Sequence, residues 1–344
     1  MLNGKRRPML MYTLGPASLE CAPELFRAGA NAVRLTFSFG SARLQETRAR
    51  ALRSVAAELG CPCIIVADLA GEKPRLGTFS TTPSIPVHTG DAIQFFHGSS
   101  GEPSQPGHLL FPVTNDRFLA ELTVGAIVVV GDGAVNLLVK QTQHERVECQ
   151  ALTGGVIDQT RGLTVQGAPF VPRALTEKDL GDLDSIAGAG VFDMVALSFV
   201  SDPHDVRRAR AVLRARSCSA CIIAKIETSS GIGNLDAIGA EADMIMAARG
   251  DLALAMPWTE LPDAMDRIAT VAKAHGKPWI LATQLMEGLE RFSMPLRPEI
   301  CDLAHWLQRG ADGVLLSYET AFGTHPVGAV EATSRMLKRW WLPS

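Results

Sequence analysis

Long hydrophobic runs are missing from this sequence. No stretch reaches the roughly 18 apolar residues that a membrane-spanning helix needs, and the N-terminus lacks the apolar segment of a signal peptide. We therefore expect a protein that neither crosses a membrane nor is secreted, with the cytoplasm as its location.

A strong excess of charge of one sign is also missing. The 33 lysines and arginines nearly balance the 36 aspartates and glutamates, for a formal net charge of -3. A surface that binds nucleic acid is normally strongly basic, so no nucleic-acid partner is expected. An anionic ligand would have to be bound at a local site.

Cysteine chemistry has little support. The chain has seven cysteines, and Cys218 and Cys221 match C-x-x-C, but no second Cys or His pair follows at zinc spacing. Cys61, Cys63, Cys149 and Cys221 fall in or beside apolar runs, as buried reduced thiols do. We expect buried free thiols rather than a redox or zinc site.

What the sequence does contain is a regular alternation of short apolar segments with helix-like stretches. Most segments are apolar on both faces, as parallel strands between helices and a barrel interior should be. A doubly wound open sheet competes, but its Gly-x-Gly-x-x-Gly fingerprint is missing. We therefore predict an α/β fold, a (β/α)8 TIM barrel. Its strands are expected at residues 8–14, 32–37, 63–69, 194–199, 221–227, 244–250, 278–283 and 313–319.

The alternation is interrupted once, after the third strand. There the pattern changes to short alternating segments with turn residues such as Gly131-Asp132-Gly133. We predict a small all-β domain inserted at 78–172, β-barrel-like, with the barrel formed by 1–77 and 173–344. An insert at this end of a barrel overhangs the active-site face, so it is a candidate lid.

Polar side chains stand where the apolar segments end. Lys225 and Glu227 share one face at the end of the fifth segment, and Asp251 follows the sixth. Two carboxylates on neighbouring strands can hold a hard divalent cation, with the lysine beside it. Taken singly, each residue could be an ion pair or a solvated strand edge. Several more gather at the same barrel mouth, which favours an active site: Arg34, Ser38, Asp68, Thr283 and Glu319.

A set of motifs in order along the chain resembles the pyruvate kinase family over nearly the whole length. The matching stretches are 13–18, 34–38, 68–71 with Arg75, 131–133, 175–179, 225–227, 248–252, 282–287 and 317–320. The family's barrel with an inserted lid agrees with the architecture expected from the apolar pattern.

The resemblance implies a substrate, a metal and a set of site residues. The substrate would be phosphoenolpyruvate or pyruvate, with a nucleoside diphosphate as the second partner. Mg²⁺ or Mn²⁺ would be held by Glu227 and Asp251. The resemblance also implies two further groups of residues. The catalytic residues would be Lys225, Arg34, Arg75 and Thr283, and the substrate-binding residues would be Gly250, Asp251, Ser198 and Arg249.

The chain departs from the family pattern on the nucleotide and monovalent-cation side. Thr36 and Phe39 replace the family's Asn and His, and Tyr318 replaces a Gly. Lys73 stands where most members have Glu, which is similar to K⁺-independent members, so no K⁺ requirement is expected. The monovalent-cation region would comprise Thr36, Ser38, Asp68, Leu69 and Lys73, and the nucleotide and lid side Arg161 and Glu319.

The chain stops after Trp340-Trp341-Leu342, where the family continues into a C-terminal domain. The resemblance therefore implies a short form without sugar-phosphate activation. The tryptophan pair is interpreted as helix-end packing, with a subunit contact in a homo-oligomer as the alternative.

Three functions remain open from the residues. The first is a pyruvate kinase that transfers the phosphoryl group of phosphoenolpyruvate to a nucleoside diphosphate. The second is a metal-dependent enzyme of phosphoenolpyruvate or the pyruvate enolate, a transferase, lyase or decarboxylase with a different acceptor. The third is a non-catalytic paralogue that binds a metabolite or a protein.

Overall fold

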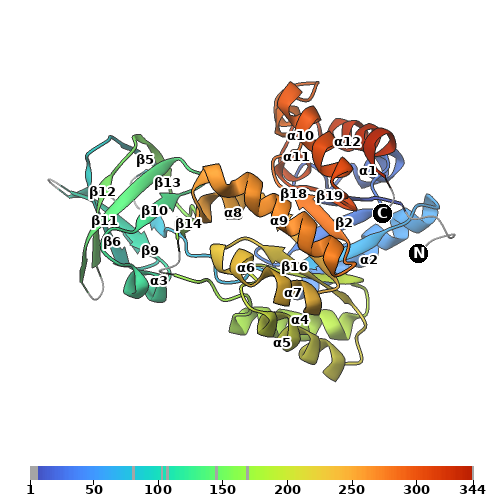
Figure 1. Ribbon diagram of the computed structural model, residues 1–344, viewed down its shortest axis with the longest axis horizontal. Helices are drawn as coiled ribbons and strands as arrows, with labels where there is room; N and C mark the ends of the chain where they lie inside the picture. Colours follow the sequence, from blue (N-terminus) through green and yellow to red (C-terminus); the bar gives the residue numbers. More distant parts are fainter. Residues whose placement is uncertain are drawn as a thin grey trace.

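The computed structural model describes residues 7–79, 82–101, 104–105, 108–143, 146–167 and 170–342. Eight parallel strands close into a barrel in the order β1-β19-β18-β17-β16-β15-β3-β2 (Figure 1). The predicted fold class is thereby confirmed. The barrel strands are β1 Met9–Thr13, β2 Ala32–Thr36, β3 Ile64–Asp68, β15 Met194–Leu197, β16 Cys221–Ile226, β17 Met244–Ala248, β18 Trp279–Ala282 and β19 Gly313–Leu316.

The barrel strands are buried on both faces, which explains their continuous apolar sequences. Their inward residues form a small inner cluster that includes Met11, Val66 and Ile280, all at 0% exposure. Their outward residues, such as Ile65 and Ile245, pack against the helices in the main core. Each fully buried aliphatic side chain of this kind contributes about 1.5–3 kcal/mol by leaving water.

Helices cover the outside of the barrel. Several begin with a side-chain cap: Asp202 and Thr176, for example, each form a capping box that satisfies backbone N–H groups of the first turn. Trp340 and Trp341, at the end of the last helix, pack partly against the main core. The helices are α1 Ala22–Ala28, α2 Ala42–Glu58, α4 Glu177–Ala189, α5 Pro203–Ala215, α6 Ser229–Gly233, α7 Leu235–Glu241, α8 Arg249–Ala255, α9 Leu261–Ala274, α10 Arg297–Gln308, α11 Tyr318–Ala321 and α12 Pro326–Trp340, with 3₁₀ turns at Trp258–Glu260 and Glu287–Glu290.

All eight barrel strands are shorter than predicted, and β15, β17 and β19 end two or three residues early. β15 ends at Leu197, because Phe199 adopts a left-handed conformation with φ of 55°. β17 and β19 end before Arg249 and Tyr318, where α8 and α11 begin directly. Apolar composition alone does not distinguish the last strand residues from the first turn of a helix.

A separate β-rich lid stands to one side of the barrel (Figure 1). Its main sheet has the order β14-β10-β11-β12-β6-β9-β8, and it has its own core around Phe95, Phe111 and Phe118. Alternating burial along β11 shows one face on this core and one in solvent. The lid elements are β4 Thr78–Phe79, β5 Ser84–Val87, β6 Ala92–His97, β7 Ser100–Gly101, β8 Ser104–Gln105, β9 His108–Val113, α3 Asp116–Glu121, β10 Ile127–Val130, β11 Val135–Gln143, β12 Arg146–Ala151, β13 Gly155–Asp158 and β14 Leu163–Val165.

The two chain segments that join lid and barrel are held together through Glu72. Its N–H donates to the carbonyl of Arg173 at 2.9 Å, and its carboxylate accepts from the Arg173 N–H at 3.0 Å. Arg117 and Asn115, from the lid, also donate to this carboxylate. Burial opposes ionisation of Glu72, but these hydrogen bonds outweigh it and hold its pKa below the usual range.

Replacing Glu72 with glutamine should lower the unfolding free energy by about 1–2 kcal/mol, since the pair with Arg117 is partly screened by solvent. The lowered pKa makes this stabilisation fully present above the ordinary glutamate pKa and lost as pH falls through the folded value. Urea denaturation of wild type and Glu72→Gln between pH 3 and 7 measures both effects. Glu121→Gln, at the more exposed partner of Arg117, is the control, and equal losses in the two variants would contradict the prediction.

Two sequence expectations have different outcomes. Among the described residues, no helix combines the length and apolarity needed to cross a membrane. Of the four thiols expected to be buried, only Cys149, in the lid core, is buried. Cys61 and Cys63 are partly buried, and Cys221 is exposed at the start of β16, so the expectation is wrong for these three.

Candidate active site

Lys225 lies near the carboxyl end of β16 with only 9% of its side chain exposed. Its ammonium donates to Ser198 Oγ at 2.8 Å and to Asp68 Oδ1 at 3.1 Å, and it lies 3.3 Å from Glu227 Oε1. Burial favours the neutral amine, but the charges of Asp68 and Glu227 outweigh it and raise the pKa of Lys225. Lys225 is therefore a buried cation, held in place by three oxygens from neighbouring strands.

Arg34 extends the same network from β2. Its Nη1 donates to Asp68 Oδ2 at 3.2 Å, and its Nε donates to Thr13 Oγ1 at 2.9 Å. One carboxylate thus holds two cations, Arg34 and Lys225, at the barrel mouth. Glu227 also lies next to Lys225, so the network joins two cations to two buried carboxylates.

Glu227 is buried beside them, 4% exposed, and accepts the backbone N–H of Phe199 at 2.7 Å. Desolvation, followed by the charge of Asp251, raises the pKa of Glu227 although Lys225 opposes the shift. A carboxylate whose negative charge is disfavoured in this way gains from a bound cation.

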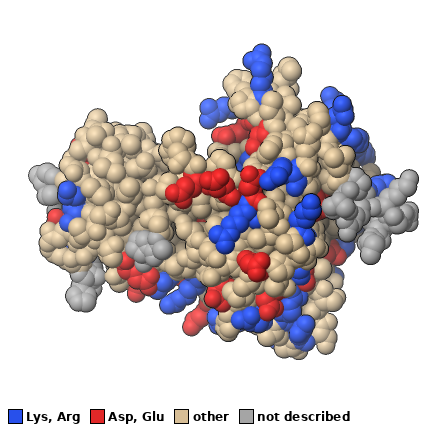
Figure 2. Space-filling view, in the orientation of Figure 1, with Lys and Arg blue, Asp and Glu red and all other residues tan. Residues whose placement is uncertain are grey.

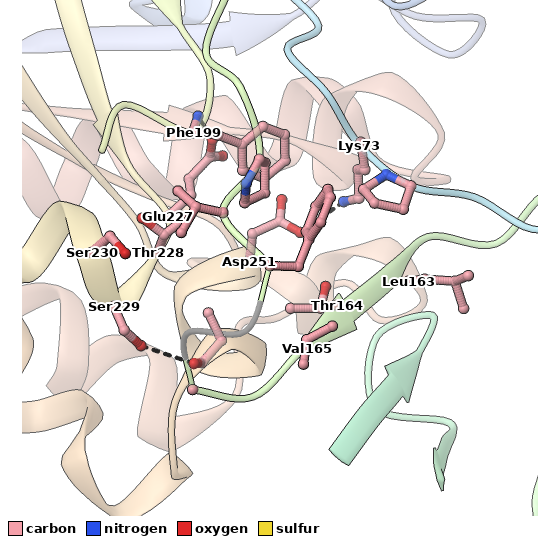
Figure 3. Close-up of a pocket in the computed structure, with 16 residues that line it drawn as sticks. Lys73, Leu163, Thr164, Val165, Phe199, Glu227, Thr228, Ser229, Ser230 and Asp251 are labelled. Carbon is pink, nitrogen blue, oxygen red and sulfur yellow. Dashed lines mark hydrogen bonds and ion pairs between the residues drawn. The ribbon is translucent and has the colours of Figure 1, made fainter. Parts of the chain in front are cut away.

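Asp251 lies in the first turn of α8 and faces the same cavity as Glu227 (Figure 3). Its Oδ1 is 2.7 Å from the ammonium of Lys73, which reaches across from the segment after β3. Within the described part of the chain, no group of three or more His, Cys, Asp or Glu side chains could enclose a metal. Two carboxylates nevertheless fit Mg²⁺, which commonly takes one or two from the protein and fills its remaining positions with water and phosphate oxygens.

The lid contacts the barrel beside this cavity: the Gly167 N–H donates to the Ala255 carbonyl of α8 at 3.2 Å. Ser229 of α6 donates to the same carbonyl at 2.9 Å. On the face drawn in Figure 2, acidic and basic side chains both gather over the middle of the molecule.

Thr283 and Gly250 meet at the ends of β18 and β17. A Cβ on Gly250 would lie 2.8 Å from Thr283 Cγ2, so a larger residue there would displace the threonine. Thr283 has φ of 74°, which is rare for a β-branched residue. The side chain of Thr283 therefore lies directly beside the backbone that leads into Asp251.

Two predicted site residues, Arg249 and Glu319, lie differently from the expectation. Arg249 is directed at the carbonyls of Thr283 and Gln284 and at Asp302, rather than into the substrate cavity. Glu319 is 1% exposed and accepts the N–H groups of Leu285, Met286 and Ser317. Its carboxylate is thus used within the protein and does not extend toward a nucleotide. From the sequence, both side chains looked free to bind a ligand, because their partners are either far away along the chain or are backbone groups.

Within the expected monovalent-cation region, Thr36 and Asp68 are paired between β2 and β3. Lys73 contacts Asp251 on the divalent-metal side. Ser38 is exposed, with its N–H 3.3 Å from Thr36 Oγ1, and Leu69 is buried, with its carbonyl accepting from Ser198 Oγ at 2.7 Å.

The two predicted basic residues nearest the lid are bound locally. Arg75 donates to the carbonyl of Thr160 at 3.2 Å. Arg161 is 47% exposed and pairs with Asp158 at 2.8 Å, beside the turn that contains Asp132. These residues lie at the lid, apart from the Lys225 network.

A second cavity of about 360 Å³ opens next to Arg34. The rings of Tyr318 and Phe322, 5.5 Å apart between centroids, line one wall. Sequence reasoning missed Arg48 and Phe322, because an arginine within α2 resembles ordinary surface charge and Phe322 follows the last matching motif. The residues that matter here are Arg34, Thr36, Phe39, Arg48, Tyr318 and Phe322.

Comparison with known proteins gives one consistent result. A family model described as the barrel domain of pyruvate kinase matches residues 5–330. Pyruvate kinase 2 of Synechocystis sp. is 32% identical over 339 residues, which are 97% of this chain and 56% of that protein. The pyruvate kinase of Methylorubrum extorquens is 34% identical over 340 residues, 98% of this chain and 69% of that protein. The pyruvate kinase of Mycobacterium tuberculosis is 33% identical over 334 residues, which are 96% of this chain and 70% of that protein.

Proposed function

The chain belongs to the pyruvate kinase family, and from this premise we propose that it transfers the phosphoryl group of phosphoenolpyruvate to a nucleoside diphosphate. The products are pyruvate and the nucleoside triphosphate. The observation that carries the proposal is the buried Lys225, held by Asp68, Ser198 and Glu227 next to the cavity shared by Glu227 and Asp251.

Lys225 and Arg34 stabilise the transferring phosphoryl group. Charge spreads over its equatorial oxygens in the transition state, and fixed cations in a desolvated site stabilise that charge without reorganising. Glu227 and Asp251 would hold Mg²⁺ or Mn²⁺, which supplies charge neutralisation of phosphate and enolate oxygens when bound. The N–H groups of Gly250 and Asp251 bind the carboxylate of the substrate, and Ser198 orients Lys225.

Thr283 lies on the side from which the enolate is protonated. As the phosphorus–oxygen bond breaks, its electron pair stays on the enolate oxygen. The enolate then becomes pyruvate when that oxygen forms the carbonyl, and the electron pair of the carbon–carbon double bond takes a proton at C3. The overall reaction consumes one proton, which comes from solvent.

The acceptor occupies the second cavity. Arg34 and Arg48 provide positive charge for its phosphates, while Tyr318, Phe322 and Phe39 are exposed aromatic surfaces on which a base can stack. The lid closes over this side and brings Arg161 toward the nucleotide. Its bounds, residues 78–172, stay a prediction. The family comparison does not favour an enolate enzyme with another acceptor, although Thr36 and Phe39 depart from the family pattern.

A single assay tests the proposal. Pyruvate release from phosphoenolpyruvate is measured with a panel of nucleoside diphosphates, with Mg²⁺ or Mn²⁺ and with chelator. We expect metal-dependent pyruvate and triphosphate in equal amounts with at least one diphosphate. Metal-dependent pyruvate release that no diphosphate stimulates would exclude the kinase reaction and leave the enolate reaction.

Turnover should change less than about twofold when Na⁺ replaces K⁺, because Lys73 supplies a fixed unit charge next to Asp251. Steady-state rates at equal ionic strength in the two salts measure this. Lys73→Met should turn over more slowly and regain part of its rate with added K⁺. Strong activation of the wild type by K⁺ over Na⁺ would refute the prediction.

A further inference from the structure

We infer that Arg249 is a positioning residue that holds Thr283 in the conformation needed for protonation of the enolate. The inference rests on the proposed function and concerns a residue outside the substrate cavity. Its basis is the backbone conformation of Thr283, the contacts of Arg249 and the anchoring of Arg249 by α10.

The backbone at the end of β18 is held in a conformation that its residues disfavour. Thr283 has φ of 74° and Gln284 has φ of 53°. A left-handed conformation is costly for a β-branched residue, and such strain persists only where the surroundings hold it. Two consecutive residues of this kind require a specific restraint.

Arg249 provides that restraint. Its Nε donates to the carbonyl of Thr283 at 3.0 Å, and its Nη2 donates to the carbonyl of Gln284 at 3.1 Å. One planar guanidinium therefore fixes both strained peptide units at once. Since Arg249 directly precedes Gly250, against which the Thr283 side chain packs, the same turn sets both the backbone and the side chain of Thr283.

The guanidinium is itself anchored from behind. Arg249 Nη1 donates to Asp302 Oδ2 at 2.6 Å, and Asp302 Oδ1 accepts from the indole N–H of Trp306 at 2.8 Å. Trp306 packs edge-on against Trp279 of β18, with 6.2 Å between ring centroids. Helix α10 is thus connected through Asp302 and Arg249 to the residue that faces the enolate.

The arrangement leaves the hydroxyl of Thr283 available. Within the described ranges, Thr283 Oγ1 makes no hydrogen bond to the protein, whereas the Thr283 carbonyl is bound to Arg249. The hydroxyl can therefore pass a solvent proton to C3 of the enolate and recover a proton from water. Its direction depends on the backbone that Arg249 restrains.

The test compares Arg249→Met, Asp302→Asn, Thr283→Val and the double variant Arg249→Met/Thr283→Val. Arg249→Met should lower kcat about 10²-fold, as misplacement of a reacting group does, with KM for phosphoenolpyruvate changed less than twofold. If Arg249 acts through Thr283, the double variant will be no slower than Thr283→Val. Deuterium incorporation into the methyl group of pyruvate in D₂O should slow in parallel. Arg216→Met, at an exposed pair with Asp184, is the matched control and should match wild type.

A second measurement does not depend on turnover. Hydrogen–deuterium exchange of peptides spanning 280–288 should rise in Arg249→Met and Asp302→Asn and stay unchanged in Arg216→Met. An inactive wild type with this exchange pattern would exclude the proposed function while retaining the restraint. Unchanged exchange, a higher KM at unchanged kcat, or additive losses in the double variant would overturn the inference. Should Arg249→Met fail to fold, Arg249→Lys and Asp302→Asn give the same comparisons.

Discussion

Replacing Lys225 with methionine should lower kcat for pyruvate formation by about 10³-fold, because the reaction loses the buried cation that faces the phosphoryl group. The ammonium is held by Ser198, Asp68 and Glu227, so no water or mobile side chain can take its place with the same geometry. Steady-state kinetics with saturating metal and diphosphate measures the loss. Lys277→Met, at the opposite end of the barrel, is the control and should retain wild-type turnover.

The same substitution should also destabilise the protein, which must be separated from the catalytic effect. Without Lys225, the buried carboxylates of Asp68 and Glu227 lose a shared partner, which costs about 3–5 kcal/mol for a buried pair. The double variant Lys225→Met/Asp68→Asn should recover part of the unfolding free energy measured in urea and none of the turnover. Recovery of turnover together with stability would show that Lys225 serves folding rather than catalysis.

Glu227→Gln should weaken Mn²⁺ binding about 10²-fold or more and abolish most turnover, because one of two carboxylate ligands becomes a neutral amide. Glutamine keeps the volume and can still accept the Phe199 N–H, so the fold should be retained. Binding is measured by electron paramagnetic resonance of free Mn²⁺ and by calorimetry. Glu241→Gln, an exposed partner of Arg207, should bind as wild type does. Unchanged Mn²⁺ affinity in Glu227→Gln would exclude Glu227 as a ligand.

The raised pKa of Glu227 adds a pH dependence. A proton competes with the metal for this carboxylate, so Mn²⁺ affinity should fall as pH decreases, starting above the range of an ordinary glutamate. In the metal-free protein the raised pKa of Glu227 makes the folding stability depend on pH instead. The contribution of Glu227 is largest below the unfolded-state pKa and is lost as pH rises through the raised folded value. Glu227→Gln should remove both dependences.

The barrel was predictable because its strands have to be apolar on two faces. Parallel strands between helices and an inner core cannot alternate polar and apolar residues, so each appears as a short continuous run. The lid was recognisable for the complementary reason, since β11 has one solvent-facing side and alternates. Strand ends were less accurate where α8 and α11 begin without an intervening loop.

The direction of several site side chains was not predictable. Arg249 is close to Asp251 in the sequence, and Lys73 is close to it in the expected fold. In the structure Arg249 binds the Thr283 and Gln284 carbonyls, whereas Lys73 binds Asp251 itself. Glu319 was expected at the nucleotide and is instead surrounded by backbone N–H groups. These partners come from other strands and helices, so no local pattern identifies them.

The sequence by itself determined which elements form and which end of the barrel carries charge, because burial imposes its periodicity on every strand. It also placed Lys225, Glu227 and Asp251 at that end. Only the tertiary structure decided how the charges are used: Lys225 is held among three oxygens, and Arg249 restrains Thr283. The physical reason is that hydrogen bonds and ion pairs act over about 3 Å between residues distant in the chain, whereas hydrophobic burial acts on whole segments.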